Sequence, residues 1–258
     1  MYSKQELLEG LATKVVGNKI FVFETIDSTN ACARTLGDAG TPEGAVVVAE
    51  FQTNGRGRQG RTWISEPESN LLFSVVLRPN VKVETAGLLT LFASVAVARA
   101  IEQCIAEPVE CKWPNDLLLH GKKFCGILLE NSFQQSGLGC AVVGVGVNVN
   151  QKTLPPEIAG GATSLARETG KEYDRKAVLH AVLTEMDDLY DSAGRGDFSF
   201  VVSEWTKRCL MLGKSVSVQQ QEHIIDGIAL RLNHDGGLVI STSGRNIAPV
   251  EMALISAR

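Results

Sequence analysis

Three arginines alternate with glycines in the segment Gly55-Arg56-Gly57-Arg58-Gln59-Gly60-Arg61. The segment formally matches GxGxxG, but that dinucleotide-binding fingerprint needs a helix directly after its third glycine. Thr62-Trp63-Ile64-Ser65-Glu66-Pro67 follows instead and is no helix start, so the dinucleotide interpretation fails. Arginine presents planar, paired donors to phosphate and carboxylate oxygens, and glycine lets the backbone come close to a ligand. The loop therefore predicts a small polyanionic ligand; the alternative is a solvated basic turn on the surface.

Two other polar segments are candidates to act with this loop. Lys112-Trp113-Pro114-Asn115-Asp116 supplies a cation, an amide and a carboxylate within five residues. Ser28-Thr29-Asn30 supplies hydroxyl and amide groups after a strand-like run. Each segment also has an ordinary interpretation, because Ser, Thr and Asn are typical helix caps and an aspartate soon after a proline is typical of turns.

These segments need a scaffold, and the apolar pattern predicts an α+β chain. A mostly buried helix is expected over residues 84–105, the longest of the chain, because its apolar residues recur at helical spacing. Later short runs predict an antiparallel meander of strands, and turn signals after residue 212 predict a small β-barrel of about fifty residues. Strands are expected at residues 20–24, 44–50, 70–78, 111–113, 116–120, 124–131, 138–148, 215–219, 224–232 and 238–241, and further helices at 31–36, 175–190 and 198–209.

Composition bounds the kind of protein. With 258 residues, of which 44% are hydrophobic and 21% charged, the chain suits one main domain and an appendage, expected at residues 1–210 and 211–258. A formal net charge of −4 predicts no general attraction to nucleic acid or an anionic membrane. We find no signal-peptide pattern and expect no membrane-length apolar run. Six cysteines without metal-binding spacing suit a reducing compartment, so a cytoplasmic location is expected.

At four short motifs the chain resembles the biotin protein ligases, in the form without an amino-terminal DNA-binding domain. The arginine loop has the family's Gly-Arg-Gly-Arg-x-Gly-Arg pattern, and residues 28–30 are similar to its Ser-Thr-Asn turn. Residues 112–116 match its Lys-Trp-Pro-Asn-Asp strand, and residues 123–130 its Lys-x-x-Gly-Ile-Leu-x-Glu strand. The resemblance implies a biotin/lipoate ligase catalytic fold, a mixed or antiparallel sheet with helices, followed by the small C-terminal β-barrel.

The resemblance implies a two-step, ATP-dependent reaction. The carboxylate of biotin attacks the α-phosphorus of ATP and expels pyrophosphate, and the resulting biotinyl-5'-AMP gives biotin to a lysine of a biotin carboxyl carrier domain. ATP and Mg²⁺ are the implied cofactors, with magnesium on the leaving pyrophosphate.

Site residues follow from the same resemblance. Arg58 and Lys112 are the expected catalytic residues, because cations must offset the repulsion between two anions. The expected biotin-binding residues are Ser28, Thr29, Asn30, Gln52, Arg56, Gly57, Arg58 and Lys112. The expected ATP- and adenylate-binding residues are Arg58, Arg61, Trp63, Lys112, Asn115 and Asn148. No metal ligand is assigned.

Three other functions are weighed against this one. A lipoate or octanoate ligase of the same fold is the nearest, although its arginine and glycine signature ending in His-Asp is absent here. A biotin-sensing repressor is not expected, because about nineteen residues precede the first predicted strand and the net charge is acidic. A non-catalytic nucleotide-binding module would retain the same motifs. A homodimer is left open.

Overall fold

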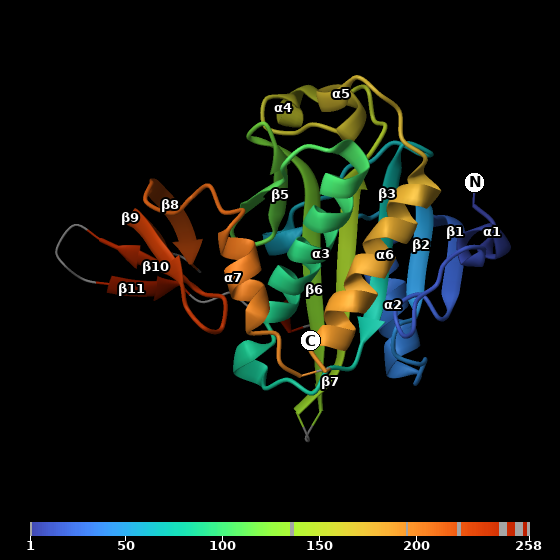
Figure 1. The fold of residues 1–258 in the computed structure, drawn as a ribbon, viewed down its shortest axis with the longest axis horizontal. Helices are drawn as coiled ribbons and strands as arrows, with labels where there is room; N and C mark the ends of the chain where they lie inside the picture. Colours follow the sequence, from blue (N-terminus) through green and yellow to red (C-terminus); the bar gives the residue numbers. More distant parts are fainter. Residues whose placement is uncertain are drawn as a thin grey trace.

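A large mixed sheet forms the centre of the protein, seen in a computed structural model that describes residues 2–134, 137–194, 196–220, 223–242, 247–250 and 255–256 (Figure 1). Its strands lie in the order β1 (Ile20–Ile26), β2 (Val46–Gln52), β3 (Asn70–Leu77), β7 (Gly137–Asn148), β6 (Lys122–Gln134), β5 (Asp116–Leu119) and β4 (Glu110–Lys112). β1 and β2 run parallel, and each following pair is antiparallel, which confirms the predicted meander of β4 to β7. β12 (Ile255–Ser256) pairs in parallel with β6.

One face of this sheet carries the main hydrophobic core. There α3 (Leu88–Ile105) packs between α6 (Arg175–Ser192) and α7 (Phe200–Thr206), as Figure 1 shows. Residues 88–98 of α3 are all buried, as expected of a helix that is apolar on every side. The ring of Phe92 packs against Tyr190 and Phe198, with ring centroids 6.1 and 5.3 Å away.

The central helix differs from its prediction in two respects. It begins at Leu88, because residues 83–85 form the separate 3₁₀ turn η2 (Val83–Thr85), so α3 and α6 have the same length of 18 residues. The expectation of no membrane-length apolar run is wrong, since Val83–Ile105 is long and apolar enough to cross a membrane. The apolar window is 72% buried within the protein, as in a core helix.

The other face of the sheet is covered by α2 (Thr29–Asp38), which starts two residues earlier than predicted. Its Ala33 packs in a small core with side chains from β2, β3 and β7, among them Val47, Val76 and Val142. Val46 and Val48 of β2 point to the main core instead, so alternate residues of one strand serve the two faces. The amino terminus of α2 is thereby fixed against the middle of the sheet.

The C-terminal part forms a second, four-stranded antiparallel sheet in the order β8 (Ser215–Gln220), β9 (His223–Leu232), β10 (Leu238–Ser241) and β11 (Ile247–Val250). Figure 1 places it beside α7 and β5, at one end of the molecule. The indole Nε1 of Trp113 donates a hydrogen bond of 3.0 Å to the carbonyl oxygen of Gly236 and joins the two sheets. The remaining helices are short: α1 (Lys4–Leu8), η1 (Arg58–Gly60), α4 (Pro156–Ala159) and α5 (Leu165–Thr169).

A buried carboxylate on α6 fixes the chain that leads into β1. Asp187 is 5% exposed and accepts backbone N–H groups from Lys14, Val15 and Val16 at 2.6, 2.8 and 2.8 Å. Hydrogen bonds to a charged acceptor are stronger than neutral ones, so this contact ties residues 14–16 to α6.

Replacement of Asp187 tests that role. We expect Asp187→Asn to lower the free energy of unfolding by about 1.5–3 kcal/mol, since the three donors lose a charged acceptor. Urea denaturation measures the change. The matched control is Asp188→Asn on the exposed side of the same helix, expected within about 0.5 kcal/mol of the parent protein. Equal effects of the two substitutions would contradict the assignment.

Candidate active site

A cavity of about 910 Å³ lies on the α2 side of the large sheet. β6 and β7 form its floor, residues 55–63 cover it, and Ser217, Val218 and Ile224 of the C-terminal sheet supply one wall. Its size suits a small-molecule substrate or cofactor. The structure brings all of the predicted site residues to this cavity, and the ligand that each binds stays a prediction: Ser28, Thr29, Asn30, Gln52, Arg56, Gly57, Arg58, Arg61, Trp63, Lys112, Asn115 and Asn148.

The floor is made by glycines that leave the sheet without side chains on one face. Gly126 of β6 pairs with Gly146 of β7, and Gly144 is the next residue of β7 on that face. A Cβ atom at Gly144 would lie 1.9 Å from Asn30 Oδ1, and one at Gly146 would lie 2.5 Å from Trp63 Cε2. Glycine is therefore required for both side chains to lie against the sheet.

A chain of polar groups lines one end of the cavity at the start of α2. Ser28 caps the helix through its hydroxyl, which accepts from the N–H of Ala31. Thr29 donates to Gln52 Oε1 through its backbone N–H at 2.7 Å and its hydroxyl at 3.1 Å. Because a backbone N–H can only donate, the amide of Gln52 is fixed with its oxygen toward Thr29 and its nitrogen left for other partners.

Asn30 is held more completely than Gln52. Its amide nitrogen donates to the carbonyl oxygen of Leu128 at 3.2 Å and to Glu130 Oε2 at 2.8 Å, while its oxygen accepts from the hydroxyl of Ser74 at 2.6 Å. Both amide hydrogens of Asn30 are thus engaged within the protein. Asn30 and Thr29 shape this end of the cavity, and the amide nitrogen of Gln52 is the group that is left to donate a hydrogen bond there among the described residues.

The loop of residues 55–63 is closed on itself by its backbone. The N–H of Gly57 donates to the carbonyl oxygen of Arg61 at 2.7 Å, and the N–H of Trp63 donates to that of Gly55 at 3.0 Å. A Cβ at Gly55 would lie 2.6 Å from the carbonyl oxygen of Trp63, so this glycine allows the closure. These contacts make residues 55–63 a compact loop, from which the arginine side chains extend.

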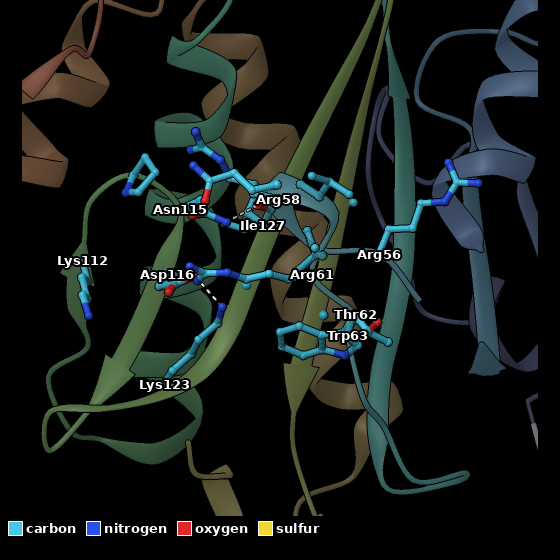
Figure 2. Close-up of a pocket in the computed structure, with 18 of the residues that line it drawn as sticks. Arg56, Arg58, Arg61, Thr62, Trp63, Lys112, Asn115, Asp116, Lys123 and Ile127 are labelled. Atoms are coloured by element: carbon cyan, nitrogen blue, oxygen red, sulfur yellow. Dashed lines mark hydrogen bonds and ion pairs between the residues drawn. The ribbon is translucent and has the colours of Figure 1, made fainter. Parts of the chain in front are cut away.

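The cations of the loop point in different directions. Figure 2 shows Arg58 and Arg61 extending toward Asn115 and Asp116, while Arg56 extends away from them and Lys112 lies farther out. Burial lowers the pKa of Arg58 from its usual value, and the nearby Asp116 offsets part of that effect. Arginine titrates so far above neutrality that Arg58 keeps its charge. Among the described residues, Arg56, Arg61 and Lys112 have no carboxylate within ion-pair distance.

Two strands carry the polar groups opposite the arginines. The side-chain amide nitrogen of Asn115 donates to the backbone carbonyl oxygen of Ile127 at 2.7 Å, and the backbone carbonyl oxygen of Asn115 accepts from the N–H of Ile127 at 3.0 Å. Asp116 forms an ion pair of 2.6 Å with Lys123 at the start of β6. Lys123 Nζ also lies 5.5 Å from the centre of the Trp63 ring, within range of a cation–π contact.

The other end of the cavity has polar atoms without partners. Asn148 donates its amide nitrogen to the carbonyl oxygen of Thr163 at 2.9 Å, which leaves its Oδ1 buried and without a hydrogen bond among the described residues. Trp63 Nε1 is also buried, and no described residue accepts a hydrogen bond from it. Unsatisfied buried polar groups are costly, so these two atoms mark positions where a bound ligand would supply the missing partner.

Several residues of the site were not predicted from the sequence. Ser74 was not singled out, and Lys123 and Glu130 were matched within a motif without a role. Their roles come from contacts with distant segments: Ser74 and Glu130 contact Asn30 of α2, and Lys123 contacts Asp116 of β5. The glycines of the floor carried a readable signal: in Gly144-Val145-Gly146-Val147 every second residue lacks a side chain, so one face of that strand is bare. The six cysteines are all free, and Cys111, Cys125 and Cys140 are buried.

Comparisons with known proteins agree with this geometry. A sequence model of the Biotin/lipoate A/B protein ligase family matches residues 22–148. The bifunctional ligase/repressor BirA of Bacillus subtilis is 33% identical over 243 residues, which cover 93% of this chain and 75% of that relative. The biotin acetyl-CoA-carboxylase ligase of Paracoccus denitrificans is 32% identical over 229 residues, which cover 86% of this chain and 95% of that relative.

Solved structures give the same result. The biotin protein ligase from Aquifex aeolicus in complex with biotin and ATP superposes with a TM-score of 0.78 at 32% identity, and the match covers 91% of this chain and 96% of that structure. The identity of 32–33% extends over 75–96% of the chains of these relatives, and it goes with the same fold and with four motifs that meet at the cavity. The chain belongs to the biotin protein ligase family.

Proposed function

We propose that the protein activates biotin with ATP to form biotinyl-5'-AMP and transfers the biotin to a lysine of a biotin carboxyl carrier domain. The observation that carries the proposal is a single cavity that joins a polar end at α2 to a row of cations and an end with unsatisfied hydrogen-bonding groups. A relative with 32% identity and the same fold is solved with biotin and ATP. The lipoate ligase alternative has no such support among the named relatives.

Biotin is proposed to bind at the Asn30 end of the cavity, formed by Ser28, Thr29, Asn30, Gln52 and Gly144. Its ureido ring offers one acceptor and two donors, which suits an end lined by hydroxyls and by the free amide nitrogen of Gln52. Arg56, Gly57, Arg58 and Lys112 then face the ring or its carboxylate.

ATP is proposed to bind toward the Asn148 end, formed by Trp63, Gly126, Gly146 and Asn148, together with Arg58, Arg61, Lys112 and Asn115. Gly144 and Asn148 are four residues apart on one strand, about 13 Å. That span lets the carboxylate of biotin and the α-phosphate of ATP meet between the two ends. Asn148 Oδ1 accepts a hydrogen bond from a donor on the ligand.

The chemical problem of the first step is the approach of two anions. The carboxylate attacks the α-phosphorus, and pyrophosphate leaves with the electron pair of the broken phosphoanhydride bond. A unit charge pair at contact is worth about 4 kcal/mol at an effective dielectric constant near 20, so Arg58 and Lys112 can offset the repulsion together. They also stabilise the charge that develops at phosphorus.

Magnesium would enter with the nucleotide. Asp116 is the only carboxylate among the described residues that line the cavity, and it is already paired with Lys123. The described lining thus offers at most one carboxylate to Mg²⁺, and phosphate oxygens and water would supply most of the other ligands. Bound Mg²⁺ would neutralise charge on the leaving pyrophosphate.

The second step and the setting of the protein complete the proposal. A carrier lysine, with a solution pKa of about 10.4, must lose its proton before its amine attacks the anhydride. AMP then leaves and an amide remains.

We propose a cytoplasmic protein that does not recognise a DNA sequence, in keeping with its acidic net charge of −4, and we leave a homodimer open.

Exchange of labelled pyrophosphate into ATP tests the first step without an acceptor protein. We expect label to enter ATP when biotin is present and to stay at background with lipoate or octanoate. Exchange that responds to lipoate and not to biotin would sink the proposal.

Lys112→Ala tests the cationic part of the mechanism. The variant loses a charge-assisted contact worth about 1.5–3 kcal/mol, so we expect kcat/KM to fall roughly tenfold to 150-fold. Lys171→Ala, at an exposed lysine outside the cavity, is the matched control and is expected to keep full activity. Full activity of the Lys112 variant would remove that residue from the reaction.

Substitutions of two floor glycines test the assignment of the two ends. Gly144→Ala displaces Asn30 and is expected to raise mainly the KM for biotin, whereas Gly146→Ala displaces Trp63 and is expected to raise mainly the KM for ATP. Overpacking that costs about 1–3 kcal/mol corresponds to a rise of roughly 5- to 150-fold. Gly160→Ala is the control, since a Cβ there has no neighbour within 4 Å. A reversed pattern would reverse the placement of the substrates.

A further inference from the structure

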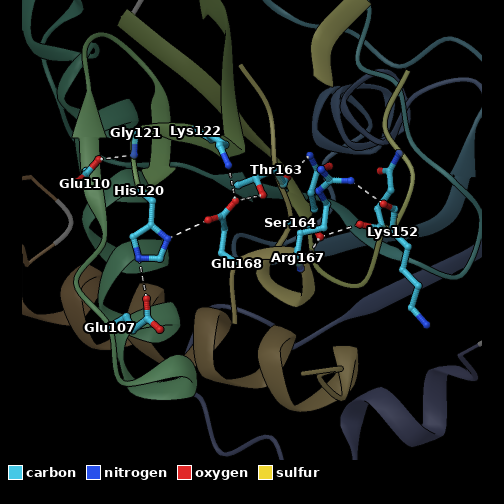
Figure 3. Close-up of polar contacts among 12 residues, drawn as sticks. Glu107, Glu110, His120, Gly121, Lys122, Lys152, Thr163, Ser164, Arg167 and Glu168 are labelled. Carbon is cyan, nitrogen blue, oxygen red and sulfur yellow. Dashed lines mark hydrogen bonds and ion pairs between the residues drawn. The ribbon is translucent and has the colours of Figure 1, made fainter. Parts of the chain in front are cut away.

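Glu168 of α5 lies outside the cavity, yet it makes polar contacts with three residues from two separate segments. Figure 3 shows it between His120, Lys122 and Thr163. Its Oε2 lies 2.8 Å from His120 Nδ1, and its Oε1 lies 3.3 Å from Lys122 Nζ and accepts the hydroxyl of Thr163 at 2.6 Å. Partial burial alone would raise the pKa of Glu168, but the hydrogen bonds from Thr163, His120 and Lys122 lower it to about 2. Glu168 is therefore an anion at neutral pH.

Its partners on the β5–β6 turn are themselves held. His120 Nε2 lies 3.1 Å from Glu107 Oε2, and the N–H of Gly121 donates to Glu110 Oε2 at 3.1 Å. The hydrogen bond to Glu168 and the charge of Glu107 raise the pKa of His120. The turn thus presents the ammonium group of Lys122 and the imidazole of His120 to Glu168.

Thr163 connects this surface cluster to the cavity. The residue is fully buried, and its N–H donates to the carbonyl oxygen of Lys123 at 2.8 Å. The N–H of Lys123 in turn donates to the carbonyl oxygen of Gly161 at 2.9 Å, so residues 161–163 pair with the first part of β6. Ala162, in the middle of that segment, lines the cavity.

The carbonyl oxygen of Thr163 determines which way Asn148 faces. Since that oxygen can only accept, the amide nitrogen of Asn148 must point to it, at 2.9 Å, and Oδ1 must point elsewhere. Oδ1 is the buried acceptor that no described residue contacts by a hydrogen bond at the Asn148 end. A shift of Thr163 would release the amide and allow it to rotate.

We propose that Glu168 is a positioning residue for the nucleotide: by accepting the hydroxyl of Thr163 it holds residues 161–163 against β6 and keeps Asn148 Oδ1 turned into the cavity. The inference rests on the proposed function, because that function assigns Asn148 to ATP. Glu168 acts through Thr163 and Asn148 and does not touch either substrate. Biotin, at the other end of the cavity, does not depend on it.

The experiment compares variants of Glu168 and Thr163 in the full chain. Glu168→Ala and Thr163→Val each break the hydrogen bond between these residues, and both are expected to raise the KM for ATP about two- to tenfold, the effect of one lost hydrogen bond. The KM for biotin and kcat are expected to stay within about twofold of the parent values. The double variant should be no worse than either single one, because both remove the same contact.

Conservative variants and a control separate positioning from general destabilisation. Glu168→Gln and Thr163→Ser keep the acceptor and the hydroxyl, and are expected to restore the KM for ATP. Glu172→Ala removes a carboxylate from the segment that follows α5, where Glu172 pairs with Lys152 at 2.6 Å on the surface, and is expected to change neither KM. Circular dichroism of each variant reports whether it is folded.

Equilibrium binding of ATP, measured by calorimetry with and without biotin, accompanies the kinetics and does not require turnover. An ATP affinity of Glu168→Ala and Thr163→Val equal to that of Glu172→Ala would overturn the inference, as would equal increases in both KM values. Absence of biotin-dependent exchange in the parent protein would instead count against the proposed function, and the affinities for ATP would still decide the role of Glu168.

Discussion

The bare face of β6 and β7 is the constraint on which the site depends. Gly126, Gly144 and Gly146 have no side chains on this face, so Asn30 and Trp63 approach the backbone there more closely than any Cβ would allow. Valines at the alternate positions, such as Val143 and Val145, anchor the same strands in the main core. The same pair of strands therefore packs in the main core on one face and leaves space for ligands on the other face. This arrangement suits a site that must hold two ligands in line.

The charge of the cavity is opposite in sign to the net charge of the chain. The protein has a net charge of −4, yet five cationic residues line the cavity beside a single carboxylate among the described residues. Local concentration of one sign focuses the field where the substrates' anions meet. Net charge predicted the absence of a general nucleic-acid surface and carried no information about this site, because the two quantities describe different length scales.

The sequence was most informative where local pattern alone decides the structure. Apolar periodicity predicted α3, α6, α7 and the meander, whereas the short helices α1, α4 and α5 were not predicted. The four short motifs contain most of the residues that were predicted to bind the substrates, and Gln52, Trp63 and Asn148 lie outside those motifs. The boundary of α3 was missed because a 3₁₀ turn and an α-helix share the same apolar spacing over a few residues. Ser74, and the roles of Lys123 and Glu130, were missed for another reason. Ser74 and Glu130 contact Asn30 of α2, and Lys123 contacts Asp116 of β5, and such tertiary contacts cannot be read from local spacing. Glu168 and Thr163 are five residues apart, but their contacts to His120 and Asn148 come from tertiary packing.

The ion pair between Asp116 and Lys123 gives the cavity an internal counterion. In the absence of substrate, the charge of Lys123 is already balanced by Asp116. The site therefore repels cations less than its number of basic residues suggests. An incoming phosphate that contacts Lys123 must exchange places with Asp116. When that phosphate departs, Asp116 is again available to pair with Lys123.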